Sequence, residues 1–480
     1  MRPDQTSSTA SMPVDVAIVV DQKWRDLPGA AALAVWLEER HGLTSALLPY
    51  GRWRETVVSR RPRALIVTHM NGSRNATIAD VARRMGARVV VIQTEGRPNN
   101  VEIMEYAVGR NLNAAAVDLW FTWSETVRDY MLQRSTMPAD RVVAAGAHRF
   151  DIYSPPLKRL IVPRAQFLNK YGLDPSRPTV TMATNFTCTK YSRTNADFLR
   201  SDWKDLGLSS QPSFSQPDAF AAADVEARER TLDVARGLLA RRPNVQLLIK
   251  PHPTEEHDRY REFAAECNER GSRVAFIGLE YIWDVLNASN VHLHRMCTTG
   301  VEAWFLDVPS VDLHVMDYHG WSLNLPGAAR EAAAGCDLVR DLDGVLASVD
   351  HYLAGGRPPA DQLASRSAYI KKWLLDLDGR RTEAHAREIA RLLASTPRDP
   401  KHRPTVVDRV RVSARKALRK LGRRTWDSEP VDHLGQVDCR ISEDDAARWL
   451  ARVRSVLAPH IASRATDSLD DSSLTESCVS

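Results

Sequence analysis

The stretch that decides the fold is Val245-Gln246-Leu247-Leu248-Ile249, followed directly by Lys250-Pro251-His252-Pro253. A continuous apolar run of this length predicts a buried strand, and the two prolines end it. The strand delivers a lysine and a histidine to its carboxyl end, where open α/β sheets bind their ligands. Thr254 is expected to cap the next helix, with Glu255 and Glu256 in its first turn. Cations at this position favour a ligand that carries phosphate.

A second strand-to-helix turn follows further along the chain. Val291-His292-Leu293-His294 runs into Arg295-Met296-Cys297-Thr298-Thr299-Gly300-Val301-Glu302, a small-residue turn that opens a helix. Free N–H groups at a helix start bind anions. Either turn alone is also compatible with a structural loop, but two such turns in one domain favour a ligand site. Together they indicate an enzyme that acts on a nucleotide sugar.

Strand and helix signals alternate twice along the chain. The first set spans residues 14–153 and the second spans 179–395, with a proline-bounded connector between them. Alternation of this kind predicts parallel sheets covered by helices, an α/β fold. We therefore expect two Rossmann-like, doubly wound domains that face a central cleft, and closing helices at residues 343–353, 360–375 and 383–393. Residues 190–219 are polar and rich in turn formers, which predicts a long loop.

The composition narrows the class of protein. A chain of 480 residues with 43% hydrophobic and 26% charged residues is typical of a soluble protein with at least two domains. The formal net charge of +5 is small for this length, so no nucleic-acid partner is expected. Six cysteines occur without a CxxC pair, which favours a reducing cytosol. Residues 1–13 do not resemble a signal peptide, and no apolar run reaches the length of a membrane span, so a cytoplasmic location is predicted.

An ordered set of short motifs carries a family resemblance over residues 14–395. The motifs are Gln93-Thr94-Glu95-Gly96, Gly146-Ala147-His148-Arg149-Phe150-Asp151, Thr184-Asn185-Phe186, Lys250-Pro251-His252-Pro253 and Arg295 to Ala303. The chain resembles bacterial surface-carbohydrate and capsule polysaccharide biosynthesis proteins of the GT-B glycosyltransferase type. The His-Pro pair is similar to that of sialic acid and Kdo transferases, in which it contacts the phosphate of a CMP-sugar. A related motif order also occurs in teichoic-acid glycerophosphotransferases, which use CDP-glycerol, and in UDP-GlcNAc 2-epimerases.

This resemblance implies a metal-independent transferase that uses a nucleotide sugar as co-substrate and needs no cofactor. Asp341-Leu342-Asp343 and Asp376-Leu377-Asp378 match a metal-binding DxD motif in letters only, because they lie beside the closing helices. We therefore expect no metal site. Side chains and helix ends are left to neutralise the phosphate.

The residues of the two turns have distinct predicted roles at the donor phosphate. Lys250 supplies a point charge, and His252 can donate a hydrogen bond or a proton to the departing phosphate. The N–H groups of Thr299 and Gly300, with the hydroxyls of Thr298 and Thr299, are expected to hold the same anion. His252 is the predicted catalytic residue of this group.

Further candidates surround the nucleotide. By resemblance Glu302 binds the ribose hydroxyls, and a solvated helix residue is the alternative. Asn185 and Thr187 follow the first strand of the second domain, where such folds approach a phosphate or base. Arg149 either faces the nucleotide or pairs with Asp151 to fix the hinge between the domains.

Glu95 is the predicted catalytic carboxylate. It follows the buried strand at residues 88–92 and precedes Gly96, so it is expected at a strand tip that faces the cleft. A general base for the acceptor hydroxyl, or the nucleophile of a retaining mechanism, needs this placement. A surface acid in a βα loop is the alternative, and the sequence leaves retention and inversion both open.

The favoured function is transfer of a sugar, with a CMP-sugar preferred, to a surface polysaccharide or glycolipid acceptor. Polyol-phosphate transfer from CDP-glycerol and a non-catalytic sugar-nucleotide-binding or scaffold protein are the alternatives.

The C-terminal part is expected to form a helical extension at residues 400–462 and a disordered tail at 463–480, which is rich in Ser and Asp. Residues 407–424 form a basic amphipathic helix that predicts peripheral contact with an anionic membrane, with a solvated helix or a partner-docking helix as alternatives. Its apolar face holds Val407, Val410, Ala414, Ala417, Leu418 and Leu421.

Overall fold

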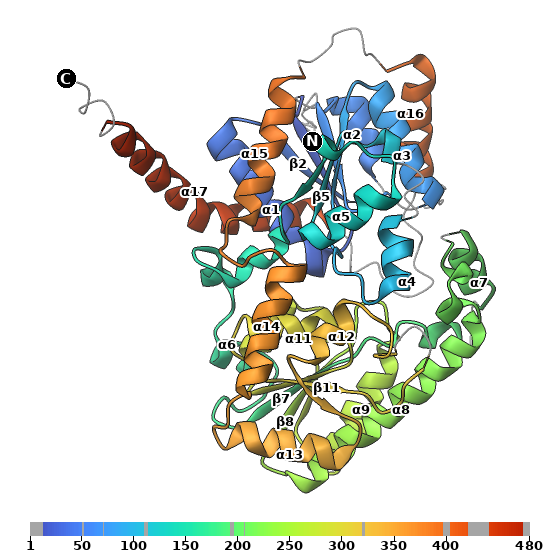
Figure 1. The fold of residues 1–480 in the computed structure, drawn as a ribbon, viewed down its shortest axis with the longest axis vertical. Helices are drawn as coiled ribbons and strands as arrows, with labels where there is room; N and C mark the ends of the chain where they lie inside the picture. The colour runs from blue at the N-terminus through green and yellow to red at the C-terminus, as the bar shows by residue number, and fades with distance from the viewer. Residues whose placement is uncertain are drawn as a thin grey trace, which may run out of the picture.

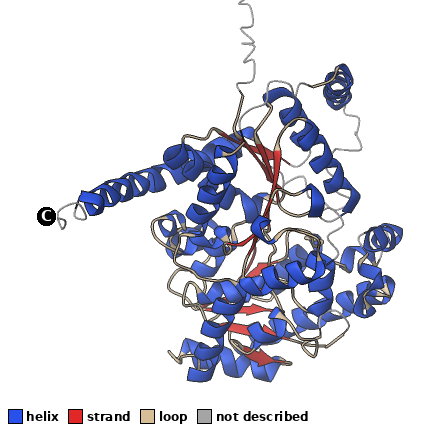
Figure 2. Ribbon diagram, turned by 45° about the horizontal axis from the view of Figure 1, so that its top comes forward, coloured by secondary structure: helices blue, strands red, loops and turns tan. Residues whose placement is uncertain are grey.

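The computed structural model shows two stacked α/β domains, each built on a six-stranded parallel sheet (Figure 1). Helices surround the strands of both sheets (Figure 2). The predicted fold class, two Rossmann-like domains with additional C-terminal helices, is confirmed. The structure describes residues 13–49, 52–70, 72–109, 114–192, 196–205, 207–318, 322–396, 404–420 and 441–473.

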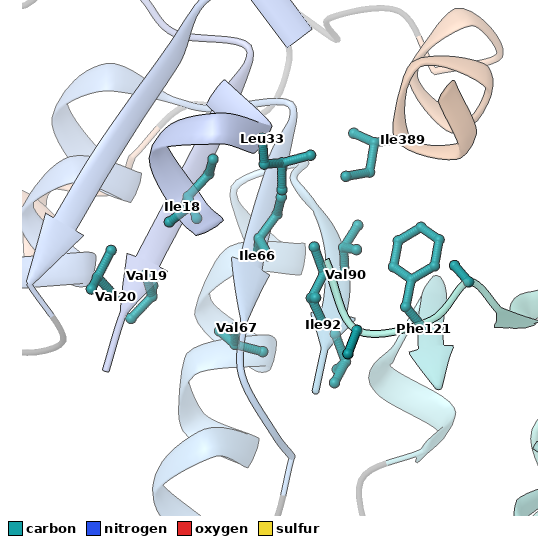
Figure 3. Close-up of a cluster of buried hydrophobic side chains, with 14 of the residues drawn as sticks. Ile18, Val19, Val20, Leu33, Ile66, Val67, Val90, Ile92, Phe121 and Ile389 are labelled. Atoms are coloured by element: carbon teal, nitrogen blue, oxygen red, sulfur yellow. The ribbon is translucent and has the colours of Figure 1, made fainter. Parts of the chain in front are cut away.

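The N-terminal domain has the strand order β2-β1-β3-β4-β5-β6, with every neighbouring pair parallel. Its central strands are apolar on both faces because helices cover both faces of the sheet. Leu33 of helix α1, Ile66 and Val90 belong to one buried cluster in this core (Figure 3). The strands are β1 (Val16–Val20), β2 (Ser45–Pro49), β3 (Ala64–Val67), β4 (Arg88–Ile92), β5 (Leu119–Thr122) and β6 (Val142–Ala144). The helices are α1 (Lys23–His41), α2 (Trp53–Arg60), α3 (Gly72–Arg84), α4 (Val101–Met104) and α5 (Glu125–Arg134).

The C-terminal domain has the strand order β12-β11-β10-β7-β8-β9, also parallel throughout. This is the Rossmann order. The chain adds β8 and β9 on one side of β7 and β10 to β12 on the other, so the order of addition switches between β7 and β10, where such sheets bind ligands. The strands are β7 (Thr179–Ala183), β8 (Gln246–Lys250), β9 (Val274–Phe276), β10 (Val291–His294), β11 (Ser310–Leu313) and β12 (Asp337–Val339). The helices are α7 (Ala196–Asp205), α8 (Pro217–Arg241), α9 (Asp258–Glu269), α10 (Ile282–Asn287), α11 (Thr298–Trp304), α12 (Ala328–Ala333), α13 (Leu342–Leu353) and α14 (Ala360–Trp373), and α6 (Arg164–Lys170) lies in the connector.

After the second domain the chain returns to the first. Helix α15 (Arg381–Ala394) packs on α1, and its Ile389 joins the N-terminal core (Figure 3). Helix α17 (Glu443–Ser473) also packs along α1, and its outer end projects from the molecule (Figure 1). Helix α16 (Val406–Lys420) lies against α2. The core of the N-terminal domain therefore contains Trp449, Val453, Leu457 and Ile461.

Four sequence-based expectations differ from the structure. The edge strands β2 and β12 were not predicted, because short half-buried segments give weak periodic signals. The predicted loop at 190–219 contains α7 and the start of α8, packed around Trp203, Phe214 and Phe220. Thr254 caps no helix, since α9 begins at Asp258. The tail expected at 463–480 is helical through Ser473, whereas residues 474–480 lie outside the described part.

Candidate functional site

A cleft of about 570 Å³ lies between the carboxyl ends of the two sheets. Its size is that of a typical small-molecule site. Its walls come from the segments after β1, β3 and β4 in one domain and after β7, β8 and β10 in the other. Nine of the ten predicted site residues line it: Glu95, Arg149, Asn185, Thr187, Lys250, His252, Thr298, Thr299 and Glu302.

His252 presents a neutral hydrogen-bond donor. Its Nδ1 accepts from the backbone N–H of Thr254 at 3.3 Å and lies 2.8 Å from the Thr254 hydroxyl oxygen. Because a backbone N–H can only donate, the ring proton belongs on Nε2. Burial lowers the pKa of His252 to about 4, so the ring is neutral at pH 7. Beside it Lys250 is buried, and its Nζ donates to the carbonyl of Gly278 at 3.3 Å.

A buried carboxylate fixes the turn that carries His252. Glu255 accepts hydrogen bonds from the backbone N–H of His252 at 2.9 Å and from the Thr184 hydroxyl at 2.8 Å. The Tyr260 hydroxyl also donates to it. Glu255 was expected in the first turn of a helix, but it lies inside the loop and is only 3% exposed. Its role is to hold the backbone of the Lys-Pro-His-Pro turn in place.

Side chains of strands β10 and β11 hold the second turn in place. Met296 has a positive φ of 45°, and its N–H donates to Asp312 Oδ1 at 2.9 Å. The hydroxyl oxygen of Thr299 lies 3.0 Å from His292 Nε2. These contacts place Thr298 and Thr299 on the cleft wall at the point where the sheet order reverses.

Gly300 does not have the role predicted for it. It is buried outside the cleft lining, and its N–H donates to the carbonyl of Cys297 at 3.1 Å. A Cβ at this position would lie 2.1 Å from Nε2 of His294. Glycine is therefore needed here for packing against the histidine, and its N–H is already bonded.

Glu302 links the two domains. It is 3% exposed, accepts from the Tyr153 hydroxyl at 2.6 Å, and pairs with Arg149 Nη2 at 3.4 Å. The alternative that it is a solvated helix residue is therefore wrong. The predicted Arg149–Asp151 pair is also absent, because Asp151 instead accepts from the N–H and the hydroxyl of Thr382, both at 2.7 Å.

Asn185 connects the loops that follow β7 and β10. Its side-chain amide donates to the carbonyl of Arg295 at 2.9 Å, and its oxygen accepts from Arg295 Nε at 3.3 Å. The amide is therefore engaged in shaping the wall, and a direct role at the nucleotide stays a prediction. Thr187 follows on the same loop and lines the cleft.

The opposite wall centres on Arg25, which the sequence analysis missed. Its guanidinium contacts Glu95, and it also pairs with Asp21 at 3.2 Å and with Asp26 at 2.6 Å. The Glu95 side chain is 72% exposed, so it projects into the open space of the cleft. Arg25 lowers the pKa of Glu95, with a smaller contribution from His252.

Asp21 was missed as well, although it follows β1 directly. Burial raises the pKa of Asp21, whereas the pKa of its neighbour Glu95 is lowered. Two carboxyl groups whose pKa values are moved apart suit two different roles in one reaction. The signal that could have found Asp21 is its position at the carboxyl end of a central strand.

Unpartnered acceptors lie on the same wall. Three oxygens of cleft residues have no hydrogen-bond partner among the described residues, at Gln22 Oε1, Thr68 Oγ1 and Gln93 Oε1. They follow three adjacent strands, β1, β3 and β4. Oxygens that accept hydrogen bonds suit a ligand that is rich in hydroxyl groups.

The described residues contain no group of three His, Cys, Asp or Glu side chains arranged to hold a metal ion. Among their helices, none combines the length and the apolar character needed to cross a membrane.

No protein-family model and no curated protein sequence matches the chain. Solved structures do match over most of its length. Staphylococcus aureus MnaA, solved with UDP, is 12% identical, covers 82% of this chain and 99% of its own, and has a TM-score of 0.52. A Listeria monocytogenes protein assigned as a UDP-N-acetylglucosamine 2-epimerase is 11% identical, covers 80% and 98%, and has a TM-score of 0.51. A third, a UDP-N-acetylglucosamine 2-epimerase, is 13% identical, covers 82% and 99%, and has a TM-score of 0.50. What these structures share with the chain is its fold, two GT-B-like Rossmann domains around a central cleft.

Proposed function

We propose that the protein is a GT-B-type glycosyltransferase of cell-surface carbohydrate biosynthesis. It transfers a sugar from a nucleotide-activated donor to a surface polysaccharide or glycolipid, and the His-Pro motif favours a CMP-sugar. The observation that carries the proposal is one cleft in which Lys250 and His252 of one domain face Asp21 and Glu95 of the other. The fold shared with MnaA, which was solved with UDP, agrees with a nucleotide-linked ligand.

The C-terminal wall stabilises the departing phosphate. Lys250 provides a positive charge, and His252 donates its Nε2–H to a phosphate oxygen. The hydroxyls of Thr298 and Thr299 contribute further donors. Because His252 is neutral, it acts through a hydrogen bond to the developing charge, and no proton has to leave the ring.

The N-terminal wall activates the acceptor and holds the sugar. Asp21, whose pKa is raised by burial, accepts the proton of the attacking hydroxyl. Glu95 stays ionised beside Arg25 and stabilises positive charge at the anomeric carbon. Hydrogen bonds from sugar hydroxyls to Gln22, Thr68 and Gln93 would satisfy oxygens that lack partners in the structure.

The donor is testable by thermal shift with CMP-, CDP-, UDP- and GDP-linked sugars. We expect one nucleotide class to raise the Tm, because a ligand at 100 times its Kd stabilises the folded state by about 2.7 kcal/mol. Lys250→Met should abolish the shift, while Arg391→Met, an exposed position on α15, should keep it. No shift with any donor would contradict the proposal.

Product analysis separates the remaining functions. Release of free nucleotide together with a glycosylated acceptor supports transfer of a sugar. Transfer from CDP-glycerol would instead indicate a polyol-phosphate transferase. A changed sugar without any acceptor would indicate an isomerase, and binding without turnover would indicate a scaffold protein.

We further propose that helix α16 holds the enzyme at an anionic membrane, beside a lipid-linked acceptor. Val406, Val407 and Val410 are 75%, 56% and 60% exposed, whereas Val412 faces the protein. Arg409 and Arg411 are exposed on the same helix. Cations near anionic lipid contribute about 1 kcal/mol each, and the valines add apolar contact. Leu421, Arg423 and Arg424 of the predicted segment lie outside the described residues.

Co-sedimentation with vesicles that contain phosphatidylserine tests this surface. The double variant Val407→Asp with Val410→Asp is expected to lower binding at low salt by about 10-fold or more, since burying a valine contributes about 1.5–3 kcal/mol. Leu363→Asp, a half-exposed position on α14, should bind like the wild type. A truncation at Pro400 is not suitable, because it also removes α17 from the N-terminal core. Equal binding by the double variant would reject the proposal.

A further inference from the structure

Arg97 is a buried cation on the cleft wall that the proposed reaction has not used. It comes directly after Glu95 and Gly96 in the loop that follows β4, lines the cleft, and is only 8% exposed. Its Nη2 donates to Asn99 Oδ1 at 2.6 Å and to the carbonyl of Met296 at 3.3 Å. Met296 opens the Cys297-Thr298-Thr299 turn, so Arg97 reaches across from the other domain to the predicted phosphate turn.

The charge of Arg97 is not compensated in the part of the chain that the structure describes. No carboxylate there pairs with it, whereas Arg25 pairs with three acidic side chains and Arg149 pairs with Glu302. Its Nη1 is buried and has no hydrogen-bond partner among those residues. Burying a cation without a counter-charge is costly unless a ligand supplies the missing charge.

Two neighbouring groups cannot supply that charge. The Tyr369 hydroxyl lies close to Arg97, and burial raises the pKa of this tyrosine, so the phenol stays neutral. Burial also raises the pKa of the Cys297 thiol. The missing counter-charge therefore has to come from outside the described residues.

The loop that carries Arg97 is clamped to the C-terminal domain. The N–H of Val101 donates to the carbonyl of Pro326, and the N–H of Ala329 donates to the carbonyl of Asn99, both at 2.9 Å. Gly327 has a φ of 148°, and a Cβ there would lie 2.4 Å from the Cα of Asn100. This close approach fixes the guanidinium beside the phosphate turn.

We propose that Arg97 binds an oxyanion of the donor and so completes the anion site from the opposite domain. The oxyanion is a phosphate of the nucleotide or a carboxylate of an acidic sugar, groups that a guanidinium recognises with the same two-pronged geometry. This inference rests on the proposed function, because it assigns a further binding residue to the same cleft.

Isothermal titration of Arg97→Met and Arg97→Lys with pyrophosphate and with CMP-N-acetylneuraminate tests the assignment. Arg97→Met is expected to weaken binding by about 10- to 100-fold, the range for hydrogen bonds to charged groups. Arg97→Lys should recover part of this loss, because it keeps the charge but not the planar fork. The Tm of unliganded Arg97→Met should be equal to or higher than that of the wild type, since an unpaired buried cation has been removed.

The probes separate the two sources of the anion. Weaker binding of pyrophosphate assigns Arg97 to the phosphate, and weaker binding of the acidic sugar nucleotide alone assigns it to the carboxylate. Wild-type affinity of Arg97→Met for both probes would overturn the inference and leave the proposed function intact. Failure of the wild-type protein to bind either probe would overturn the inference, whereas the proposed function is overturned only if none of the four donor classes shifts the Tm. A large fall in the Tm of Arg97→Met and Arg97→Lys would show a structural role instead.

Discussion

Replacement of Glu95 by glutamine is expected to lower kcat/KM by about 10²- to 10³-fold, the range for removal of one preorganised group that stabilises charge in the transition state. Glutamine has nearly the same shape as glutamate, so the loss would come from the charge. Glu95 is ionised beside Arg25 and exposed to the cleft, so its carboxylate is available to the anomeric centre. The measurement is steady-state kinetics with the donor found by thermal shift.

Two controls separate chemistry from folding. Glu125→Gln changes an exposed carboxylate on α5, outside the cleft, and should leave the rate unchanged. Donor affinity of Glu95→Gln should stay close to that of the wild type, because the phosphate contacts lie on the other wall. Wild-type turnover in Glu95→Gln would remove Glu95 from the mechanism.

Replacement of His252 by alanine should lower kcat by about 10²- to 10³-fold, as removal of one preorganised donor to an oxyanion does in other enzymes. The loss should appear mainly in kcat, because the hydrogen bond strengthens as charge develops on the phosphate. His252→Gln should retain more activity than His252→Ala, since its amide can place an N–H near the position of Nε2.

The dependence on pH tests the protonation state of His252. With a pKa of about 4, the ring is already neutral at pH 6, so kcat/KM should not fall between pH 6 and 8 on account of this group. A histidine that acted as a cationic acid with an ordinary pKa would lose activity over that interval. A decline centred near pH 6.5 that disappears in His252→Gln would contradict the neutral donor.

Much of the fold was predictable because buried parallel strands have a strong local signal. The run at residues 245–249 and the pattern at 291–294 both form strands at the centre of one sheet, as expected. Strands that end at one edge of a sheet bring their loops together, which is why Lys250, His252 and Thr299 were correctly expected on one side.

The details that failed depend on partners distant in the sequence. Gly300 resembles an anion-binding glycine locally, but contact with His294 determines its role. For Glu302 only the alternative of a solvated helix residue failed, because Arg149 and Tyr153 of the other domain lie against it, and the predicted contact with the ribose stays a prediction. Arg25 pairs locally with Asp21 and Asp26, but its contact with Glu95 gives no sequence signal, because it crosses from one strand end to another.

The return of α15 and α17 to the first domain has a consequence for synthesis on the ribosome. The apolar surface of α1 is synthesised before the second domain, but the side chains that cover it, among them Trp449 and Leu457, belong to α17, which follows that domain in the chain. At about 5–20 residues per second, that interval is on the order of tens of seconds. The second domain is continuous in sequence and can complete its own core during this time. The nascent chain would therefore mature in the reverse of its domain order, and the uncovered face of α1 would need chaperone protection until α17 is complete.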